Sequence, residues 1–255
     1  MSKRQDVSKT LLCGIILLVA AVSSGYAKRS KVSHIPKKIH STKEIFTMIA
    51  PILPKDPIIV EAGAFNGKDS VLLANFWQQG HVHSFEPVPE LYAKVVKATE
   101  NCNNVSTYQV ALADKEGTAD FYISSFTATP GSPSASSSLL TPTGHLSAWS
   151  CIKFKKKLSV PTITIDAWAE KNSIGHVDFI WLDTQGSELS ILKSAPRILK
   201  TVKAMLLEVE FVELYKDQPL FTDVKTWLEA NGFKFVAMRA WKLYGDALFV
   251  RTATR

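Results

Sequence analysis

Cysteine is scarce in this sequence, and no short motif of metal ligands is present. The 255 residues include only three cysteines, Cys13, Cys102 and Cys151, and none belongs to a Cys-x-x-Cys pair or a Cys/His cluster. Structural zinc sites need such ligands at close spacing, so the sequence gives no support for a metal site. Cys102 and Cys151 could form a disulfide, but their spacing does not require one, and two structural thiols are the simpler interpretation.

An excess of positive charge is absent from most of the chain, although the whole sequence has a formal net charge of +7. Residues 1–40 contain eight basic side chains and one acidic side chain, which accounts for all of the excess. Residues 41–255 contain 22 side chains of each sign. A nucleic-acid-binding domain has a basic surface, so nucleic acid is not an expected partner. The balanced part is long enough for one domain with a sizeable core.

The N-terminal residues combine a basic start with a run of apolar side chains. Residues 11–22 are apolar except for Gly14, and Gly25-Tyr26-Ala27 places small residues where a signal peptidase cleaves. These features are typical of a secretory signal peptide that is removed near Ala27. Residues 10–27 are also just long enough for a single membrane-spanning helix. In that case the stronger basic flank after the run favours a cytoplasmic location for the following domain.

Strand and helix patterns alternate over residues 41–255, which we expect to form one domain after a signal or anchor segment and basic linker at 1–40. One long helix is expected over 187–199. The expected strands lie at 57–63, 81–85, 105–112, 177–182, 202–209, 233–238 and 247–251. This alternation predicts an α/β fold with a parallel sheet and helices on both faces. Seven strands, with the last two close together around 244–246, fit a methyltransferase-type Rossmann sheet better than that of a dinucleotide dehydrogenase.

Residues 113–165 interrupt this alternation. Residues 117–124 and 151–165 have the alternating pattern of strands, and the stretch between them is rich in serine, proline, threonine and glycine. We therefore expect a β-hairpin inserted into the α/β domain. Long connections of this kind are usually functional or disordered, and we expect residues 124–150 to form a mobile lid.

Ligands bind open α/β sheets at the carboxyl ends of the strands. The first strand ends in the segment 61–67, EAGAFNG, in which Gly63 permits a tight turn and Gly67 permits the close approach of a ligand. The GxGxxG pattern that cradles a pyrophosphate is absent, which disfavours NAD and FAD. The second strand ends in Glu86, whose carboxylate can accept hydrogen bonds from vicinal ribose hydroxyls.

Further acidic residues follow the later strands. Asp183 follows the strand at 177–182 and could orient or deprotonate an acceptor hydroxyl. Glu188 is better explained as a residue that favours the start of the next helix. Glu208 and Glu210 could line an acceptor pocket or lie at the edge of the core. The six histidines have no ligand spacing, so we expect them to be structural or exposed.

Five segments of the chain together resemble one known family. They are IVEAGAFNGKDS from Ile59, FEP from Phe85, VALADKEG from Val110, ITIDAW from Ile163 and DFIWLDTQGSELSILKSA from Asp178. Their order and spacing resemble those of the FkbM family of S-adenosylmethionine-dependent methyltransferases over roughly residues 45–251. The resemblance implies a class I methyltransferase fold, S-adenosylmethionine as the methyl donor and usually O-methylation.

The resemblance also implies roles for individual residues. Asp183 falls on the acceptor side and is the expected catalytic residue. Gln185 departs from the family's usual Asp-x-Glu-Gly-x-Glu, where it replaces the first glutamate. Activity would be in doubt if that carboxylate were catalytic or bound a cation, and would survive if it only braced the loop. The expected cofactor-binding residues are Glu61, Gly63, Ala64, Asn66, Gly67, Glu86 and Pro87.

We therefore expect methyl transfer to a hydroxyl group of a small-molecule, glycan or lipid acceptor. S-adenosylmethionine is held mostly in the cytosol, so an active enzyme predicts a single-pass N-terminal anchor with the domain on the cytoplasmic side. The alternative is an inactive protein of the same fold that is secreted or held at the cell surface and binds a partner.

Overall fold

The computed structural model describes residues 37–129 and 132–252. The apolar segment 10–27, expected to be a signal or a hydrophobic anchor helix, lies outside the described residues. No helix in the described part of the chain is long and apolar enough to cross a membrane. Cys102 and Cys151 are both free thiols.

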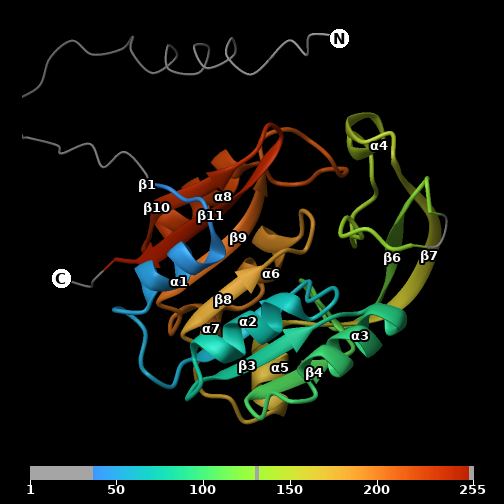
Figure 1. The fold of residues 1–255 in the computed structure, drawn as a ribbon. Coiled ribbons are helices and arrows are strands. Elements are labelled where there is room, and N and C mark those ends of the chain that lie inside the picture. Colours follow the sequence, from blue (N-terminus) through green and yellow to red (C-terminus); the bar gives the residue numbers. More distant parts are fainter. Residues whose placement is uncertain (1–36, 130–131, 253–255) are drawn as a thin grey trace, which may run out of the picture. The chain divides into compact units, whose positions relative to one another are not determined.

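A mixed sheet of eight strands lies at the centre of the domain (Figure 1). Its order is β1-β10-β11-β9-β8-β2-β3-β4. Only β11 runs antiparallel to its neighbours β9 and β10 among these described strands. The predicted α/β fold class is confirmed, but the sheet is mixed instead of wholly parallel because β11 is reversed. The strand order with one reversed strand agrees with the class I methyltransferase fold that the resemblance implies. The strands are β1 Lys37–Lys38, β2 Ile58–Ala62, β3 His81–Phe85, β4 Val105–Tyr108, β8 Phe179–Leu182, β9 Ala204–Glu210, β10 Phe233–Ala240 and β11 Tyr244–Arg251.

The sheet has one strand more than the seven that the sequence predicts. The additional strand is β1, in which Lys37 and Lys38 pair in parallel with Ala237 and Met238 of β10. Both lysines are exposed. This strand is defined by its backbone pairing alone, so no alternation of apolar residues could have predicted it.

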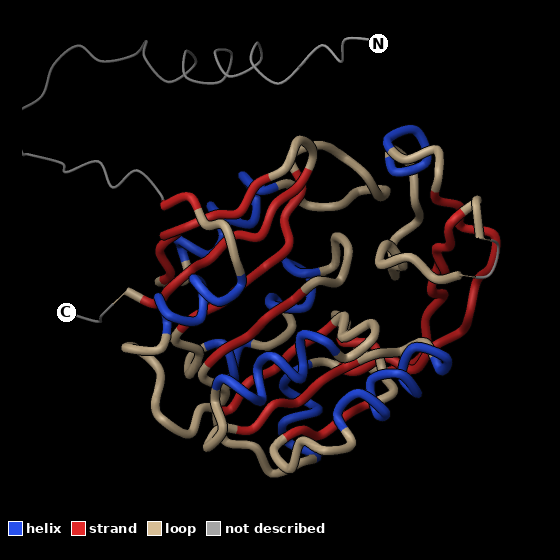
Figure 2. The backbone as a smooth tube through the Cα atoms, viewed as in Figure 1, coloured by secondary structure: helices blue, strands red, loops and turns tan. Residues whose placement is uncertain are grey.

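Helices cover both faces of the sheet (Figure 2). Alternate residues of β8 belong to opposite cores: Phe179 and Trp181 to one, Ile180 and Leu182 to the other. Burial of each such large apolar side chain contributes roughly 1.5–3 kcal/mol. The first core includes residues of α1 (Thr42–Ile49) and α2 (Lys68–Phe76), and α3 (Pro89–Thr99) packs beside α2. The second core includes residues of α5 (Ile165–Lys171), α6 (Glu188–Lys193), α7 (Pro196–Leu199) and α8 (Phe221–Ala230).

Three of the predicted elements are divided or begin more than two residues away from the predicted range. The helix expected over 187–199 divides into α6 and α7 before Pro196, because proline lacks a backbone N–H and disfavours helical geometry in the preceding residue. The strand expected over 105–112 divides into β4 and β5 (Ala111–Leu112), and β5 joins a second sheet. The final turn precedes Tyr244, which is the first residue of β11.

The inserted β-hairpin is present as predicted. β6 (Gly117–Phe126) and β7 (Ile152–Ile163) pair antiparallel, and β5 completes the three-stranded second sheet. The hairpin stands beside the main sheet, with α4 (His145–Ala148) at its far end (Figure 1). The Tyr122 N–H donates to the Ser138 carbonyl at 2.8 Å, and an isolated bridge joins Pro142 to Tyr215. The expected lid is thus attached to both the hairpin and the loop after β9, and its mobility stays a prediction.

Candidate functional site

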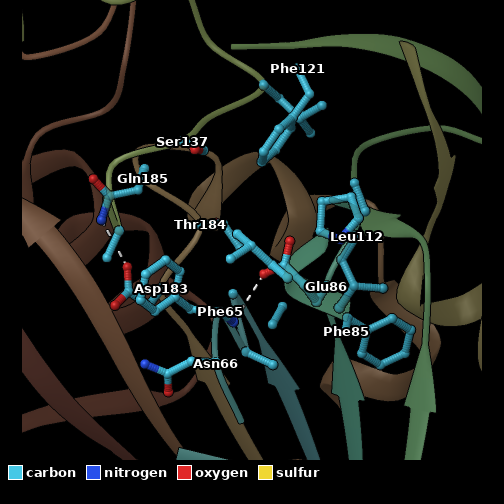
Figure 3. A pocket seen from close by; sticks show the side chains of 18 of the residues that line it. Phe65, Asn66, Phe85, Glu86, Leu112, Phe121, Ser137, Asp183, Thr184 and Gln185 are labelled. Atoms are coloured by element: carbon cyan, nitrogen blue, oxygen red, sulfur yellow. Dashed lines mark hydrogen bonds between the residues drawn. The ribbon is translucent and has the colours of Figure 1, made fainter. Parts of the chain in front are cut away.

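A cavity of about 240 Å³ lies at the carboxyl ends of β2, β3 and β8. Figure 3 shows Asn66 after β2, Glu86 after β3 and Asp183 after β8 around this space. Leu112 and Phe121, from the second sheet, contribute apolar surface to it. The cavity therefore occupies the edge where an open α/β sheet binds its ligands. Of the expected cofactor-binding residues, those in its lining are Gly63, Ala64, Asn66, Glu86 and Pro87.

Gly63 allows the loop after β2 to pack against the end of β8. Its φ of +87° lies in the left-handed region that favours glycine. A Cβ atom on Gly63 would lie 2.0 Å from the carbonyl oxygen of Asp183. The glycine is required by this contact as well as by the turn, and the contact brings the loop after β2 next to Asp183.

Glu86 is held in the cavity by two backbone N–H groups. Its Oε2 accepts a hydrogen bond from Phe65 N–H at 2.9 Å (Figure 3), and its Oε1 accepts one from Val88 N–H at 2.9 Å. Burial raises the pKa of Glu86 to about 7, and the two N–H groups oppose this rise. Each oxygen can still accept a further hydrogen bond, so a ligand hydroxyl can bind this fixed carboxylate.

Glu61 and Gly67 do not line the cavity, although the sequence analysis places both at the cofactor. Glu61 is 3% exposed, and its Oε2 accepts hydrogen bonds from Ser70 Oγ at 2.6 Å and Ser84 Oγ at 2.7 Å. A Cβ atom on Gly67 would lie 2.9 Å from the Cβ of Ala98 in α3. The structure therefore gives them structural roles: Glu61 joins α2 to β3, and Gly67 permits the close approach of α2 and α3.

Asp183 is joined to Gln185, two residues later in the same loop. Gln185 Nε2 donates a hydrogen bond to Asp183 Oδ1 at 2.8 Å (Figure 3) and another to Glu208 Oε2. Burial raises the pKa of Asp183 to about 6, and the hydrogen bond from Gln185 opposes this rise. Gln185 thus bridges two carboxyl groups that repel each other when both are ionised.

Gln185 also connects the loop after β8 to other parts of the chain. Its φ of +57° is unusual for a residue with a side chain. Its Oε1 accepts a hydrogen bond from the Tyr215 hydroxyl at 2.9 Å, and its carbonyl accepts one from Ser138 Oγ at 2.8 Å. An ionised glutamate at this position could not donate to Asp183 and Glu208. The amide therefore fits its surroundings.

Glu188 braces the same loop from the first turn of α6. Its Oε1 accepts hydrogen bonds from the Thr184 N–H at 2.7 Å and the Thr184 hydroxyl at 2.8 Å, and its Oε2 accepts one from the Gly186 N–H at 3.0 Å. These bonds occupy the carboxyl group inside the protein. Glu188 is therefore a structural residue at a helix start, in agreement with the sequence analysis.

A second cavity, of about 380 Å³, adjoins the first. Asp183, Gln185 and residues 134–135 of the inserted segment line both cavities. Glu208 and Glu210, at the end of β9, line the second. Two ligands could therefore meet at Asp183, one from each side.

The carboxyl groups of the second cavity hold their protons more tightly than exposed ones do. Burial raises the pKa of Glu210 to about 9, with further contributions from Glu188 and Asp183. Burial also raises the pKa of Glu208, and the neighbouring Asp183 adds to this rise. Among residues 37–129 and 132–252, no group of three or more His, Cys, Asp and Glu side chains is arranged to hold a metal ion.

The second cavity also contains aromatic residues that the sequence analysis did not place in a site. Tyr244 pairs with Glu210 in the β11–β9 register, and Trp241 follows the end of β10. Because β11 runs antiparallel, its first residue lies at the edge where β9 ends. The predicted pairing of the last two strands around 244–246 could have indicated that this turn lies at the same edge as the end of β9. His145, expected to be structural or exposed, is buried and lines the same cavity together with Trp149.

Comparisons with solved structures give low similarity scores. Fibrillarin, a pre-rRNA processing protein of Methanococcus jannaschii, has a TM-score of 0.46 at 15% identity, covering 80% of this chain and 70% of that one. The N-terminal domain of EvdMO1 with SAH bound has a TM-score of 0.46 at 11% identity, covering 85% of this chain and 83% of that one.

The 2-O-methyltransferase NoeI of Sinorhizobium fredii is 26% identical over 217 residues, which is 85% of this chain and 88% of NoeI. The model of the methyltransferase FkbM domain matches residues 61–235, well over half of the chain. This match includes the loops that line the first cavity and the end of β9. The chain therefore belongs to the FkbM family of methyltransferases.

Proposed function

We propose that this protein transfers the methyl group of S-adenosylmethionine to a hydroxyl oxygen of an acceptor. The observation that carries the proposal is the pair of adjoining cavities that share Asp183 at the carboxyl edge of the sheet. The first cavity would hold the donor, and the second would hold the acceptor. Membership of the FkbM family and the 26% identity to a 2-O-methyltransferase support this assignment.

The residues of the first cavity suit S-adenosylmethionine. Glu86, fixed by two N–H groups, can accept hydrogen bonds from the two ribose hydroxyls. Phe85, Leu112 and Phe121 offer apolar surface to the adenine ring. The Asp183 carboxylate favours a positively charged group nearby. When bound, S-adenosylmethionine supplies a methyl group activated by its attachment to a sulfonium sulfur.

Asp183 would serve as the proton acceptor at the junction of the cavities. Its carboxyl group, with a pKa of about 6, is mostly ionised at neutral pH and can accept the proton of the acceptor hydroxyl. The acceptor oxygen forms its bond to the methyl carbon as the carbon–sulfur bond breaks, and the electron pair of that bond passes to sulfur. The loops that hold both ligands in line would supply most of the rate.

Isothermal titration calorimetry of the full chain with S-adenosylmethionine tests the donor site. Glu86→Ala is expected to weaken binding by about tenfold or more, because a hydrogen bond to a charged group contributes about 1.5–3 kcal/mol. Glu61→Gln, which alters a buried carboxyl group outside the cavity, is the matched control and is expected to bind nearly as wild type does. The absence of binding by the wild type, or equal binding by Glu86→Ala, would overturn the donor-site assignment.

Transfer of a labelled methyl group tests the role of Asp183. Asp183→Asn is expected to bind S-adenosylmethionine. Its rate of methyl transfer to the acceptor is expected to be lower by at least about 100-fold, the usual effect of removing a general base. Transfer at the wild-type rate would contradict the role of Asp183 while leaving the donor site intact.

A further inference from the structure

The inserted hairpin of β6 and β7 carries a patch of positive charge that the proposed function does not use. We propose that this hairpin is an interaction surface for anionic lipid headgroups, which holds the domain against a membrane. The proposal goes beyond methyl transfer and does not depend on it. It is carried by two properties of the hairpin: its charge and the apolar side chains exposed at its end.

The hairpin collects positive charge that the rest of the domain lacks. Residues 153–157 include four lysines. Residues 117–163 contain no further lysine or arginine and only one acidic residue, so this part of the chain has a formal charge of +3. The whole domain, residues 41–255, has a formal charge of zero. A local excess of positive charge of this kind attracts a surface of negative charge.

Most of this charge is available to a partner. Lys157 Nζ lies 3.0 Å from Asp120 Oδ2, which neutralises it in part. In the part of the chain that the structure describes, the ion pairs include none with Lys153, Lys155 or Lys156. Lys155 and Lys156 are also exposed. These lysines can therefore approach anionic headgroups without first breaking an ion pair.

Apolar side chains are exposed at the end of the hairpin where these lysines begin. Phe126, the last residue of β6, is 41% exposed and pairs with Ile152, the first residue of β7. Leu146 is 45% exposed and belongs to α4, which lies at the far end of the hairpin (Figure 1). Binding to a membrane interface combines both features, because apolar side chains enter the boundary of the acyl chains while lysines attract the headgroups.

The N-terminal part of the sequence favours a lipid surface over other anionic partners. Its apolar run at 11–22 is directed to a membrane in both predicted forms, the signal and the anchor. In the anchored form, residues 28–36 span at most about 30 Å when fully extended, so the domain stays close to the bilayer. A tethered surface needs little affinity of its own, because its effective concentration is high. The cytoplasmic leaflet is also rich in anionic lipids.

A polarity-sensitive fluorophore on Cys151 tests the proposal, because Cys151 is exposed and directly precedes β7. The full chain carries Cys13→Ser and Cys102→Ser, so that only this thiol is labelled. It is mixed with vesicles of phosphatidylcholine, or of equal parts of phosphatidylcholine and phosphatidylserine, that contain a nitroxide lipid as quencher. With phosphatidylserine, a blue shift and quenching are expected at a vesicle concentration about tenfold lower than without it.

The same fluorophore at Glu100→Cys, in a chain without the three native cysteines, is the matched control. Glu100 is exposed and follows α3 before β4 begins, at the edge of the main sheet opposite Glu86. Its emission is expected to stay unchanged. No response of the Cys151 label to the anionic vesicles, or an equal response at both positions, would overturn the proposal. A response at Cys151 to soluble polyglutamate but not to the vesicles would also overturn it and would indicate an acidic protein as the partner.

Charge-reversal variants link the contact to the lysines. Lys155→Glu/Lys156→Glu is expected to raise the vesicle concentration for a half-maximal response by about tenfold or more. Lys193→Glu/Lys200→Glu changes the net charge equally at two exposed positions around α6 and α7 and is expected to respond as wild type does. No effect of the first pair, or equal effects of both pairs, would overturn the proposal. If circular dichroism shows that the first variant is unfolded, Lys155→Gln/Lys156→Gln replaces it, with an expected effect of about threefold.

Calorimetry with S-adenosylmethionine separates this proposal from the proposed function. Lys155→Glu/Lys156→Glu is expected to bind S-adenosylmethionine as wild type does, because neither lysine lines the first or the second cavity. If the wild type binds S-adenosylmethionine and the Cys151 label does not respond to anionic vesicles, the membrane contact is wrong and the proposed function stands. If the label responds and S-adenosylmethionine does not bind, the membrane contact stands and the proposed function fails.

Discussion

Gln185 Nε2 lies 2.8 Å from Asp183 Oδ1, so an amide donor stands next to the proposed proton acceptor. The same nitrogen donates to Glu208. An uncharged donor between two carboxyl groups favours their ionised forms, whereas a third carboxylate would disfavour them. The glutamine that departs from the family pattern therefore supports an ionised Asp183 in this protein.

Gln185→Glu is expected to raise the pKa of Asp183 by about one unit or more, because like charges in one site disfavour ionisation. Methyl transfer that depends on ionised Asp183 would then need a higher pH. The measurement is kcat/KM for methyl transfer as a function of pH. The acidic limb of this profile is expected to move to higher pH in Gln185→Glu. Gln185→Ala, which removes the bridge without adding a charge, is expected to move it less. An unchanged limb in Gln185→Glu would refute the coupling.

Glu210 is expected to make the stability of the protein depend on pH. Burial raises its pKa to about 9, whereas an unfolded glutamate titrates near 4.3. Because the pKa of Glu210 is higher in the folded chain than in the unfolded chain, its contribution to the free energy of unfolding is full below about pH 4.3. This contribution is lost as the pH rises from there toward 9. Between pH 7 and 9 the free energy of unfolding should therefore fall by up to about 1.4 kcal/mol per pH unit from this group.

Urea denaturation at pH 7, 8 and 9 measures this slope. Glu210→Gln resembles the protonated acid but does not titrate, so the slope is expected to become smaller. Glu100→Gln, at an exposed position beyond α3, is the control and should keep the wild-type slope. Equal slopes for Glu210→Gln and wild type would show that Glu210 ionises normally in the folded state.

Gly63→Ala is expected to destabilise the protein by at least about 2 kcal/mol, since an added Cβ meets the Asp183 backbone at 2.0 Å and the φ of +87° disfavours a side chain. Binding of S-adenosylmethionine should weaken as well, because the loop must move away from β8. Gly175→Ala is the matched control, because its Cβ meets no atom within 4 Å. Chemical denaturation of both variants gives the comparison, and equal stabilities would contradict the close approach at Gly63.

The location of the domain can be tested with protease added to intact cells that express the full chain. If residues 10–27 are retained as an anchor, the domain is expected to be protected until the cells are permeabilised, because the basic flank keeps it on the cytoplasmic side. A domain that is digested in intact cells, with a mature N-terminus at Lys28, would instead support secretion after signal cleavage.

Part of the donor site could be predicted from the strand pattern alone. Glu86 and Asp183 each follow an apolar strand, and parallel strands bring their carboxyl ends to one edge. The same alternation of side chains along β2 indicates that Glu61 points away from the cavity. It shares a face of β2 with Ile59, two residues earlier, and that face packs against α1 and α2. A residue on this face lies beneath α2, and there the Ser70 hydroxyl donates a hydrogen bond to Glu61.

The acceptor side depends on contacts that no local pattern announces. Tyr215 reaches Gln185 from a loop 30 residues later, and His145 reaches the second cavity from the inserted segment. Side-chain hydrogen bonds between distant loops follow from the final packing of the chain, and sequence periodicity does not specify them. The position of Trp241 at this edge of the sheet could have been predicted, because it follows from the reversal of β11.

That reversal separates the parts of the protein that can change during evolution. The turn between β10 and β11 lies on the far side of β9 from the strands that carry the Gly63 and Glu86 loops. Substitutions in residues 241–244 can therefore accumulate without disturbing the loops around the first cavity. A lineage of such proteins could acquire new acceptors by varying one short turn while its donor remains the same.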